Sequence, residues 1–425
     1  MGLRPGDLNL ASQADMASIG EAPYEYLEVL RREAPVWWNP PPPVEHMHVP
    51  CTGFWVLSRY DDVDAVSKDP ARFSAWENSV LWVDVQQNPI ALQAQRSGLM
   101  GMDPPQHTSY RRLLQPGMTP RRIAALEPFI EAEAANVVAE LAAKDRAEFV
   151  FEAAAELPMI LLCQMMGVPQ EQRREYLRIA NNVANVEFAE NFEHTMFELY
   201  LFLDDLVKNS GDLDSDTMLS KYTHGEVDGR SLTPDEITQF FVTLSIAGHE
   251  TTRNTTAHFV RLMDEHPDQK ALLLEDLDGR LPNAIEEVLR YSPPVMQFCR
   301  TATEDVEMEG ATITKGDKVY LSYISANRDA EVFDDPNRFD ILRPNASSHL
   351  AFGAGPHFCL GASVARTQLR CLLSELYRRL PDLTLAEPYT PMGSVWFNAI
   401  TEMPVLTCPH AAASGVGSGS EGSSS

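Results

Sequence analysis

The stretch that decides the fold is Phe352-Gly353-Ala354-Gly355-Pro356-His357-Phe358-Cys359-Leu360-Gly361. It places a cysteine among glycines, directly before a run of helix-forming residues that begins at about Leu360. A metal-binding thiolate must be deprotonated, and a helix N-terminus favours the anion through its free N–H groups and positive dipole end. The glycines leave room for a large flat ligand beside the backbone, and Phe352 is able to shield the sulfur. The pattern indicates a thiolate ligand at Cys359; the alternative is a Gly-rich turn with an incidental buried cysteine.

The other cysteines are scattered and form no CxxC pair: Cys51, Cys163, Cys299, Cys371 and Cys408. This spacing predicts neither a disulfide framework nor a structural zinc site, and we expect a reduced, cytoplasmic setting. The most apolar run, residues 157–168, has about 12 residues, whereas a membrane span needs about 20. We therefore expect no membrane segment.

The charge balance limits the partners. The chain of 425 residues carries 61 Asp+Glu against 34 Lys+Arg, a formal net charge of -27. A surface this acidic is repelled by phosphate, which argues against nucleic acid and anionic membranes as partners.

Helical patterns dominate the chain. The strongest start signal is Thr233-Pro234-Asp235-Glu236, a capping box with proline at the first helical position. It predicts a helix that continues to His266, on the order of 30 residues or 45 Å. Shorter helices are expected at about 60–67, 120–140, 282–291 and 360–380, and strands at 53–58 and within 306–325, with residues 315–317 as the hairpin turn.

The fold class predicted from this pattern is mainly α with a minor β portion. Strands and helices do not alternate as in a doubly wound sheet, and neither GxGxxG nor GxxxxGK[ST] is present to bind a nucleotide. Residues 211–230 are polar and are expected to form a loop. The tail 411–425 is almost entirely Gly, Ser and Ala and is expected to be disordered.

Four motifs, in this order, resemble those of the cytochrome P450 family of haem-thiolate monooxygenases. They are Ala247-Gly248-His249-Glu250-Thr251-Thr252, Glu287-Val288-Leu289-Arg290, Phe333-Asp334-Asp335-Pro336-Asn337-Arg338-Phe339, and the cysteine stretch 352–361. The resemblance spans about Tyr24 to Leu406. It implies the P450 fold, one large domain over residues 24–410 with a long central helix above the haem, after an N-terminal extension 1–23.

The resemblance implies haem b as the cofactor and gives the cysteine stretch its role. Cys359 would be the axial iron ligand in a loop with Phe352, Gly353 and Gly361, and a thiolate ligand favours O–O cleavage. The haem propionates would be bound by His107, Arg111, Arg300 and His349. His357 is expected on the surface that faces the redox partner.

The segment Ala247 to Thr251 would handle oxygen. Gly248 would permit a local widening of the helix for O2, Thr251 would hydrogen-bond the dioxygen, and Glu250 would relay protons from solvent. Read without the resemblance, Thr251 merely bonds back to a carbonyl one turn earlier and Glu250 is a solvated charge. His249 is expected to pack. Glu287, Arg290 and Arg338 would form a structural ion triad.

The expected substrate pocket is apolar, which favours a hydrophobic substrate. Its candidate lining residues are Leu81, Val83, Leu99, Thr243, Val295, Met296, Phe298, Trp396 and Phe397. A softer resemblance of residues 34–39, 247–254 and 296–303 points to the bacterial branch that oxidises sterol side chains, terpenoids and branched lipids.

No flavin or ferredoxin domain is fused to the chain, so the resemblance implies a separate ferredoxin and ferredoxin reductase as electron donors. An arginine group would bind the acidic ferredoxin; its members are Arg112, Arg121, Arg122, Arg366 and Arg370. The alternative is that these arginines are scattered, solvated charges. A monomer is expected.

The predicted function is insertion of one oxygen atom of O2 into a C–H bond. Two alternatives stay open: a haem-thiolate sensor or carrier without oxygenase activity, and a peroxide-driven variant. The pair Glu250-Thr251 speaks against both, because a carrier needs no proton relay and peroxide-driven relatives usually lose this pair.

Overall fold

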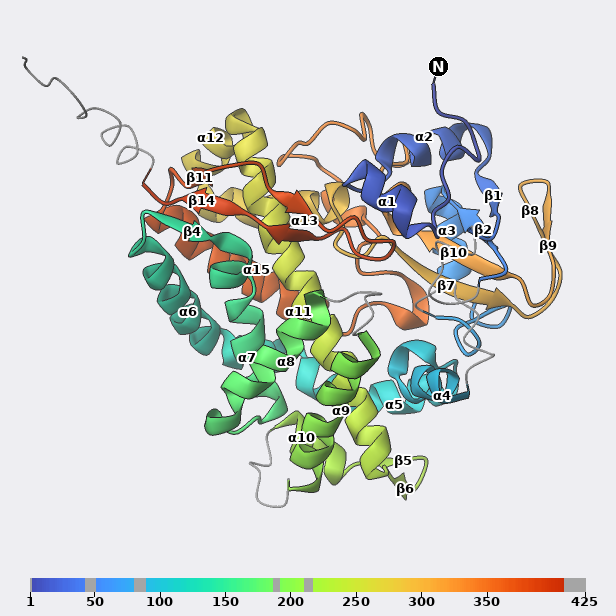
Figure 1. Ribbon diagram of the computed structural model, residues 1–425, viewed down its shortest axis with the longest axis horizontal. Helices are drawn as coiled ribbons and strands as arrows, with labels where there is room; N and C mark the ends of the chain where they lie inside the picture. Colours follow the sequence, from blue (N-terminus) through green and yellow to red (C-terminus); the bar gives the residue numbers. More distant parts are fainter. Residues whose placement is uncertain (1, 43–50, 80–88, 186–191, 210–216, 409–425) are drawn as a thin grey trace, which may run out of the picture.

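The computed structural model describes residues 2–42, 51–79, 89–185, 192–209 and 217–408. Within these ranges it is mostly helical with a minor share of strand; the largest sheet lies on the right of the molecule, and smaller sheets lie on the left and at the bottom (Figure 1). The fold-class prediction is therefore confirmed. The tail from residue 411 and the pocket candidates Leu81 and Val83 lie outside the described residues.

The helices are α1 Gln13–Ile19, α2 Tyr24–Glu33, α3 Tyr60–Ser67, α4 Pro89–Ser97, α5 Gln106–Leu114, α6 Pro120–Ala142, α7 Glu156–Met166, α8 Arg173–Asn185, α9 Phe192–Lys208, α10 Met218–Thr223, α11 Pro234–Glu265, α12 Pro267–Glu275, α13 Leu277–Tyr291, α14 Tyr323–Ala326 and α15 Ala362–Arg379. The strands are β1 Val36–Asn39, β2 Phe54–Leu57, β3 Phe73–Ser74, β4 Arg146–Glu148, β5 Glu226–Val227, β6 Arg230–Ser231, β7 Gln297–Ala302, β8 Val306–Met308, β9 Ala311–Ile313, β10 Lys318–Ser322, β11 Thr384–Leu385, β12 Thr390–Pro391, β13 Ile400–Glu402 and β14 Pro404–Leu406.

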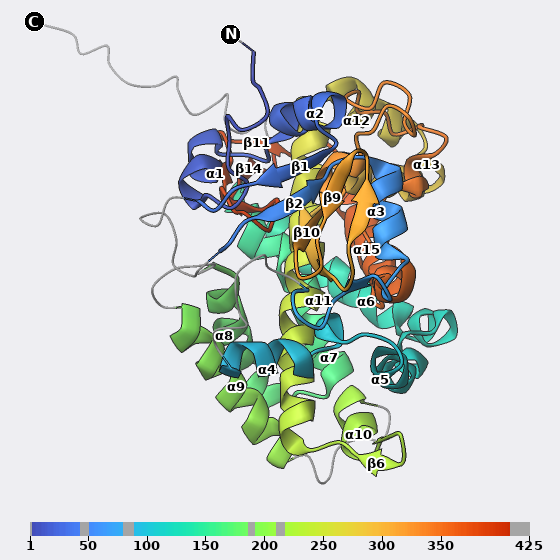
Figure 2. The same cartoon turned by 90° about the vertical axis from the view of Figure 1, so that its right-hand side faces the viewer.

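Helix α11 is the axis of the molecule, and Figure 2 shows it running from the helical half toward the sheet half. It has 32 residues, and both hydrogen bonds of the predicted capping box are present between Thr233 and Glu236. Nearly every residue from Thr252 to Met263 is buried, because helices and C-terminal strands surround this part. None of the described helices is long and apolar enough to cross a membrane.

The main sheet has the order β1-β2-β10-β7-β3, and its strands were predicted only in part. The expected hairpin turn at residues 315–317 is wrong. The paired hairpin is β8–β9, and its turn is made by Glu309 and Gly310, both with positive φ, as a tight two-residue turn requires. Gly316 instead turns the chain from β9 into β10, which lie in different sheets.

Two further segments differ from expectation. Residues 217–231 are not a loop, because α10 and the β5–β6 hairpin form there. Helix α13 begins at Leu277 and not at Pro282, since the Asp276 side chain accepts from the N–H of Gly279 and starts the helix one turn earlier.

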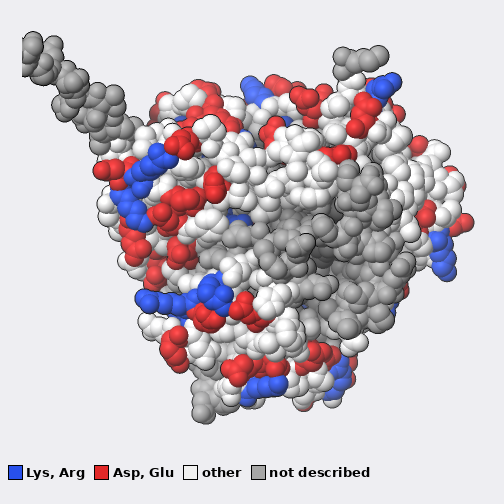
Figure 3. All heavy atoms as spheres, in the orientation of Figure 1, with Lys and Arg blue, Asp and Glu red and all other residues white. Residues whose placement is uncertain are grey.

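The N-terminal residues belong to the packed body. Leu10 and Met16 are buried against Tyr26 in one apolar cluster, and the boundary at residue 23 stays a prediction. On the face shown in Figure 3, acidic side chains lie among smaller basic patches, in keeping with the negative net charge.

Candidate active site

Cys359 lies between the 3-10 turn η9, Gly355–His357, and the N-terminus of α15. Its N–H donates to the carbonyl of Phe352 at 2.8 Å, which closes the loop. Burial raises the pKa of the Cys359 thiol, whereas the N–H groups of Gly361 and Ala362 and the charge of Arg111 act in the opposite direction. The sulfur therefore lies where a helix N-terminus favours the thiolate, as the sequence predicted.

Tight backbone packing explains a glycine of this loop. A Cβ on Gly355 would lie 2.3 Å from the carbonyl oxygen of Ser67, and its φ of +65 is in the left-handed region. Only glycine fits there without strain, so the turn before Cys359 is fixed against the end of α3.

One face of α11 opens onto a hollow. Ala247 is exposed and Gly248 and Thr251 are partly exposed, although the helix around them is buried. The hydroxyl of Thr251 donates to the carbonyl of Ala247 at 2.9 Å. The helix is regular α throughout this segment, so the local widening expected at Gly248 is not present.

Glu250 is not a solvated charge. Its side chain is 3% exposed, and Arg253 Nη2 lies 2.5 Å from its Oε2. His249 Nδ1 lies 3.0 Å from its Oε1. Burial raises the pKa of Glu250, but Arg253, His249 and the nearby Asn254 amide outweigh burial and hold the pKa below its usual value. The carboxylate is thus held inside the protein by a cation, so the alternative of a solvated charge is wrong, and the proton relay stays a prediction.

Two arginines, Arg111 and Arg300, and two neutral histidines, His107 and His357, gather beside the cysteine loop. Arg111 donates to the carbonyls of Pro356 at 3.2 Å and Phe358 at 2.6 Å. The rings of His107 and His357 lie 4.4 Å apart, and Nε2 of each is buried without a hydrogen-bond partner. Burial and the charges of Arg111 and Arg300 lower the pKa of His107 to about 4.

His357 belongs to this cluster; the residue is half-buried with its Nε2 turned inward, and its role toward a redox partner stays a prediction. Burial, then Arg300, His107 and Arg111, lower its pKa to about 2. The turn η9 directs the ring of His357 back toward His107 of α5. The signal in the sequence was the position of His357, two residues before Cys359. Such a group of mutually repelling donors fits an anionic ligand, and the two carboxylates of a haem supply that charge.

The iron needs a ligand set that the protein does not supply alone. Among the described residues, no group of three or more His, Cys, Asp or Glu side chains could hold a metal ion. A lone thiolate suits a metal that arrives with other ligands, as iron does in a porphyrin.

Comparisons with known proteins agree with this arrangement. The family model described as cytochrome P450 matches residues 202–381. A steroid C26-monooxygenase of Rhodococcus jostii is 34% identical over 389 residues, which cover 90% of this chain and 81% of that protein. The chain belongs to the cytochrome P450 family. A methyl-branched lipid omega-hydroxylase of Mycobacterium tuberculosis is 34% identical over 388 residues, 88% of this chain and 89% of that protein.

A solved structure gives the same answer for the fold. A Mycobacterium marinum cytochrome P450 in complex with pseudoionone has a TM-score of 0.86 and 33% identity, and the match covers 96% of this chain and 100% of that one. The protein is therefore a cytochrome P450 monooxygenase with haem b as its cofactor, and the residues around Cys359 fit that group.

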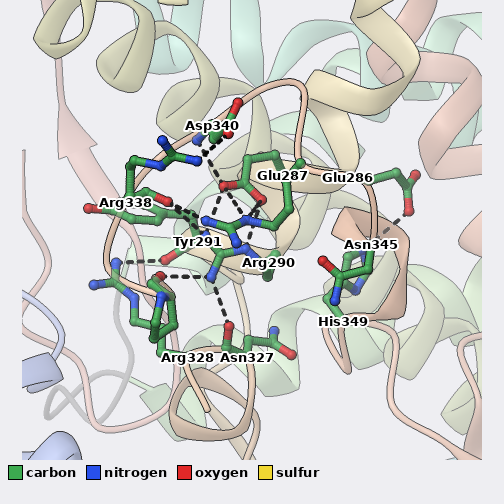
Figure 4. A network of polar contacts seen from close by, with 12 residues as sticks. Glu286, Glu287, Arg290, Tyr291, Asn327, Arg328, Arg338, Asp340, Asn345 and His349 are labelled. Atoms are coloured by element: carbon green, nitrogen blue, oxygen red, sulfur yellow. Dashed lines mark hydrogen bonds and ion pairs between the residues drawn. The ribbon is translucent and has the colours of Figure 1, made fainter. Parts of the chain in front are cut away.

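The structural triad of this P450 has a different third member from the one predicted. Arg290 Nε donates to Glu287 Oε2 at 2.7 Å, and Arg343 Nε reaches both oxygens of Glu287 at 3.2 Å. The Arg338 side chain is 62% exposed and pairs with Asp340 at 2.8 Å (Figure 4). Arg338 contributes its backbone carbonyl, which accepts from Arg290 and Arg343. The prediction for its guanidinium is wrong.

His349 is buried next to an acid. Its Nε2 lies 3.2 Å from Oε2 of Glu286 (Figure 4), and Arg366 binds the same carboxylate at 2.6 and 2.7 Å. Burial raises the pKa of Glu286. Arg366 and His349 outweigh burial and lower this pKa to about 2. The expected contact of His349 with a propionate stays a prediction, and here the ring is paired within the protein.

Four of the predicted pocket residues lie together. Val295 and Phe397 are bridged backbone to backbone and belong to one apolar cluster, against which Phe298 and Trp396 pack. Ile246 of α11, which the sequence did not single out, joins the same cluster.

Of the remaining pocket candidates, Met296 packs away from this cluster, whereas Thr243 lies one turn before Ala247 on the open face of α11. Met296 packs in the N-terminal cluster with Leu10 and Tyr26, because consecutive residues of an extended chain point to opposite sides; its assignment to the pocket is wrong. Leu99 packs against the helical core. Thr243 donates its hydroxyl to the carbonyl of Gln239 at 3.1 Å.

Proposed function

We propose that this P450 hydroxylates a C–H bond of a sterol side chain, a terpenoid or a methyl-branched lipid, with electrons from a separate ferredoxin and its reductase. The observation that carries the proposal is the apolar cluster of Val295 and Phe397 beside Ile246, close in sequence to the hollow face of α11. An apolar wall of this kind favours a hydrocarbon substrate.

The relatives favour the same substrate class. Two of the similar proteins are named steroid C26-monooxygenase and methyl-branched lipid omega-hydroxylase. Both names describe hydroxylation of a lipid, and the described wall residues bring no charge that would bind a carboxylate or phosphate in their place.

The protein's own residues would divide the work as follows. Haem, when bound, supplies the binding and activation of dioxygen, which a thiolate ligand such as Cys359 promotes. His107, Arg111, Arg300 and His357 would bind the propionates. The hydroxyl of Thr251 is partly exposed toward the hollow, and its oxygen keeps lone pairs free to accept a hydrogen bond.

The electron donor would bind on the cysteine side. Arg112 of α5 and Arg121 of α6 are exposed there, next to Arg111, which contacts the cysteine loop. Arg366 and Arg370 are partly neutralised, because they pair with Glu286 and Glu127. The docking charge for an acidic ferredoxin therefore rests on Arg112 and Arg121 more than on the other two.

Reconstituted turnover tests the proposal. The holoenzyme is supplied with NAD(P)H, a ferredoxin reductase and a ferredoxin, and is presented with sterols, terpenes and branched fatty acids that shift the haem spin state. A hydroxylated product supports the proposal. A spin shift without oxygenated product from any partner would leave a binding or sensor protein, and product formed from hydrogen peroxide alone at an equal rate would favour the peroxide-driven alternative.

A further inference from the structure

The loop that carries Trp396 and Phe397, two aromatic residues of the apolar wall, is fixed on one side by the chain before β7. The N–H of Met296 donates to the carbonyl of Trp396 at 2.9 Å, and Val295 is bridged to Phe397. Within the loop, the Ser394 hydroxyl accepts from the N–H groups of Trp396 and Phe397 at 2.9 and 2.8 Å. These contacts leave the opposite side of the loop to another element.

Helix α1 holds the loop on that opposite side. In the first turn of α1, Nε2 of Gln13 donates to the carbonyl of Gly393 at 2.8 Å, across 380 residues of sequence. The two backbones also lie close together, since a Cβ on Gly393 would be 3.1 Å from Cα of Ala17 and 3.5 Å from the carbonyl oxygen of Met16. Gly393 has a φ of +63, in the left-handed region that favours glycine. A residue without a side chain therefore lets the loop lie directly against α1 (Figure 1).

Neighbouring residues of the loop face two different clusters. Val395 is 4% exposed and packs in the cluster of Met16 and Tyr26. Phe397 belongs to the wall cluster, and Trp396 packs against it. The loop is thus a single layer between α1 and the apolar wall. Because protein interiors are close-packed and transmit displacements, a shift of this layer on α1 also moves Trp396 and Phe397.

Helix α1 is itself fixed to the main sheet. Asn39, at the end of β1, is fully buried. Its side chain accepts from the N–H of Leu10 at 3.0 Å and donates to Oδ1 of Asn9 at 2.9 Å. The hydroxyl of Ser12 then caps α1 by accepting from the N–H of Asp15. The helix is therefore a supported element, and its contacts position the loop that lies on it.

We propose that Gln13 is a positioning residue for the substrate: by fixing the carbonyl of Gly393 it sets where Trp396 and Phe397 lie, and so which carbon of a bound lipid is presented for hydroxylation. This rests on the proposed function. Oε1 of Gln13 is buried without a hydrogen-bond partner among the described residues, so the bond to Gly393 is what fixes this amide. A displacement of about 1 Å in groups that position a substrate changes a rate by about a hundredfold, so a small shift of the wall is enough to favour another carbon.

The test compares Gln13→Met with Ser18→Ala in the haem-loaded enzyme. Methionine keeps the side-chain length and the helix propensity but removes the donor. Ser18 is exposed on the same helix, and its hydroxyl donates to the carbonyl of Asp15 within that helix. With one lipid substrate, we expect Gln13→Met to change the ratio of hydroxylated positions about threefold, including any position new to the variant. Ser18→Ala should keep the wild-type ratio.

The product ratio separates positioning from a merely structural role. A variant that is only less stable yields less active enzyme, but each folded molecule still hydroxylates the same positions in the same ratio. Lower haem content in Gln13→Met with an unchanged ratio therefore overturns the proposal. An equal change of the ratio in both variants overturns it too.

Two further readouts need no turnover. The dissociation constant of clotrimazole, a bulky azole that binds ferric haem, is followed by the shift of the haem absorption band and should change about threefold in Gln13→Met only. A crystal structure of the Gln13→Met holoenzyme should show residues 393–397 displaced from α1. A loop that stays in place contradicts the proposal. If the wild type forms no product, the proposed function fails, while azole affinity and loop position still decide whether Gln13 sets the wall.

Discussion

At the residue scale, three side chains show which roles a sequence motif predicts and which it does not. Cys359 was identified by its glycines and by the helix that follows, and it lies as expected at the N-terminus of α15. The third member of the ion triad was not identified from the sequence, because Arg338 and Arg343 both follow the same acidic segment. Only the packed chain shows that Arg343 folds inward onto Glu287 while Arg338 points to solvent.

The triad assignment predicts unequal costs for two similar substitutions. Arg343→Ala leaves the buried Glu287 with one cation fewer and should lower the free energy of unfolding by about 3–5 kcal/mol. Arg338→Ala removes an exposed side chain and should change it by less than about 0.5 kcal/mol. Urea unfolding of the two holoproteins measures the difference, and equal losses would return the role to Arg338.

The cysteine loop predicts a similar contrast between two glycines. Gly355→Ala forces a Cβ against Ser67 and a strained backbone, which costs about 1–3 kcal/mol and should reduce haem incorporation. Gly117→Ala is the control, since no atom lies within 4 Å of its Cβ position. Haem content per chain after purification reports the effect; full occupancy in Gly355→Ala would show that the loop tolerates the shift.

At the scale of elements, local signals predicted some features correctly, and features that depend on distant packing were missed. The capping box at Thr233 predicted where α11 begins, because a cap depends on residues three positions apart. The β8–β9 hairpin was missed, because Glu309 adopts a positive φ that its residue type does not announce. The burial of Glu250 was not predicted, because it depends on the packing of His249 and Arg253 beside it, which no motif describes.

Helix α11 is joined to the C-terminal strands by a histidine whose protonation state is fixed. His258 Nε2 lies 2.9 Å from the carbonyl of Asn398, and Arg261 Nε donates to its Nδ1 at 3.2 Å. The carbonyl requires an N–H at Nε2, so Nδ1 is the free acceptor and the ring is neutral. Burial, then Arg261, lowers the pKa of His258 to about 3.

This histidine predicts a pH dependence of stability. Between pH about 6.5 and about 3 the unfolded chain binds a proton at His258 that the folded chain refuses, so the free energy of unfolding falls as pH falls through that window. His258→Gln keeps a donor for the carbonyl and should flatten this part of the curve. Unfolding followed from pH 7 to pH 4 measures the slopes; identical slopes would contradict the buried neutral ring.

At the scale of the whole molecule, the sum of charges and the local charges act differently. The net charge of -27 argues against broad binding of nucleic acid, yet Arg112 is exposed directly after Arg111, which contacts the cysteine loop, and Arg121 is exposed as well. The N-terminal residues Leu10 and Met16 are packed with Tyr26 in one apolar cluster of this body.

The docking proposal predicts a charge-reversal effect. Arg112→Glu should raise the ferredoxin concentration needed for half-maximal reduction about tenfold at low salt, with less difference at high salt. The substrate-induced spin shift should not change, because Arg112 faces solvent. Stopped-flow reduction by ferredoxin measures this; equal reduction rates for both proteins would place the docking surface elsewhere.

The central claim is that Cys359 binds haem iron as a thiolate, and the carbon monoxide spectrum of the reduced protein tests it most directly. The account predicts that the wild type shows the red-shifted absorption band typical of thiolate-ligated haem. Cys359→Ser should lose this band, although Arg111, Arg300, His107 and His357 would still bind the propionates. A Cys359→Ser protein that keeps the band, or a haem-loaded wild type that lacks it, would contradict the assignment of the site.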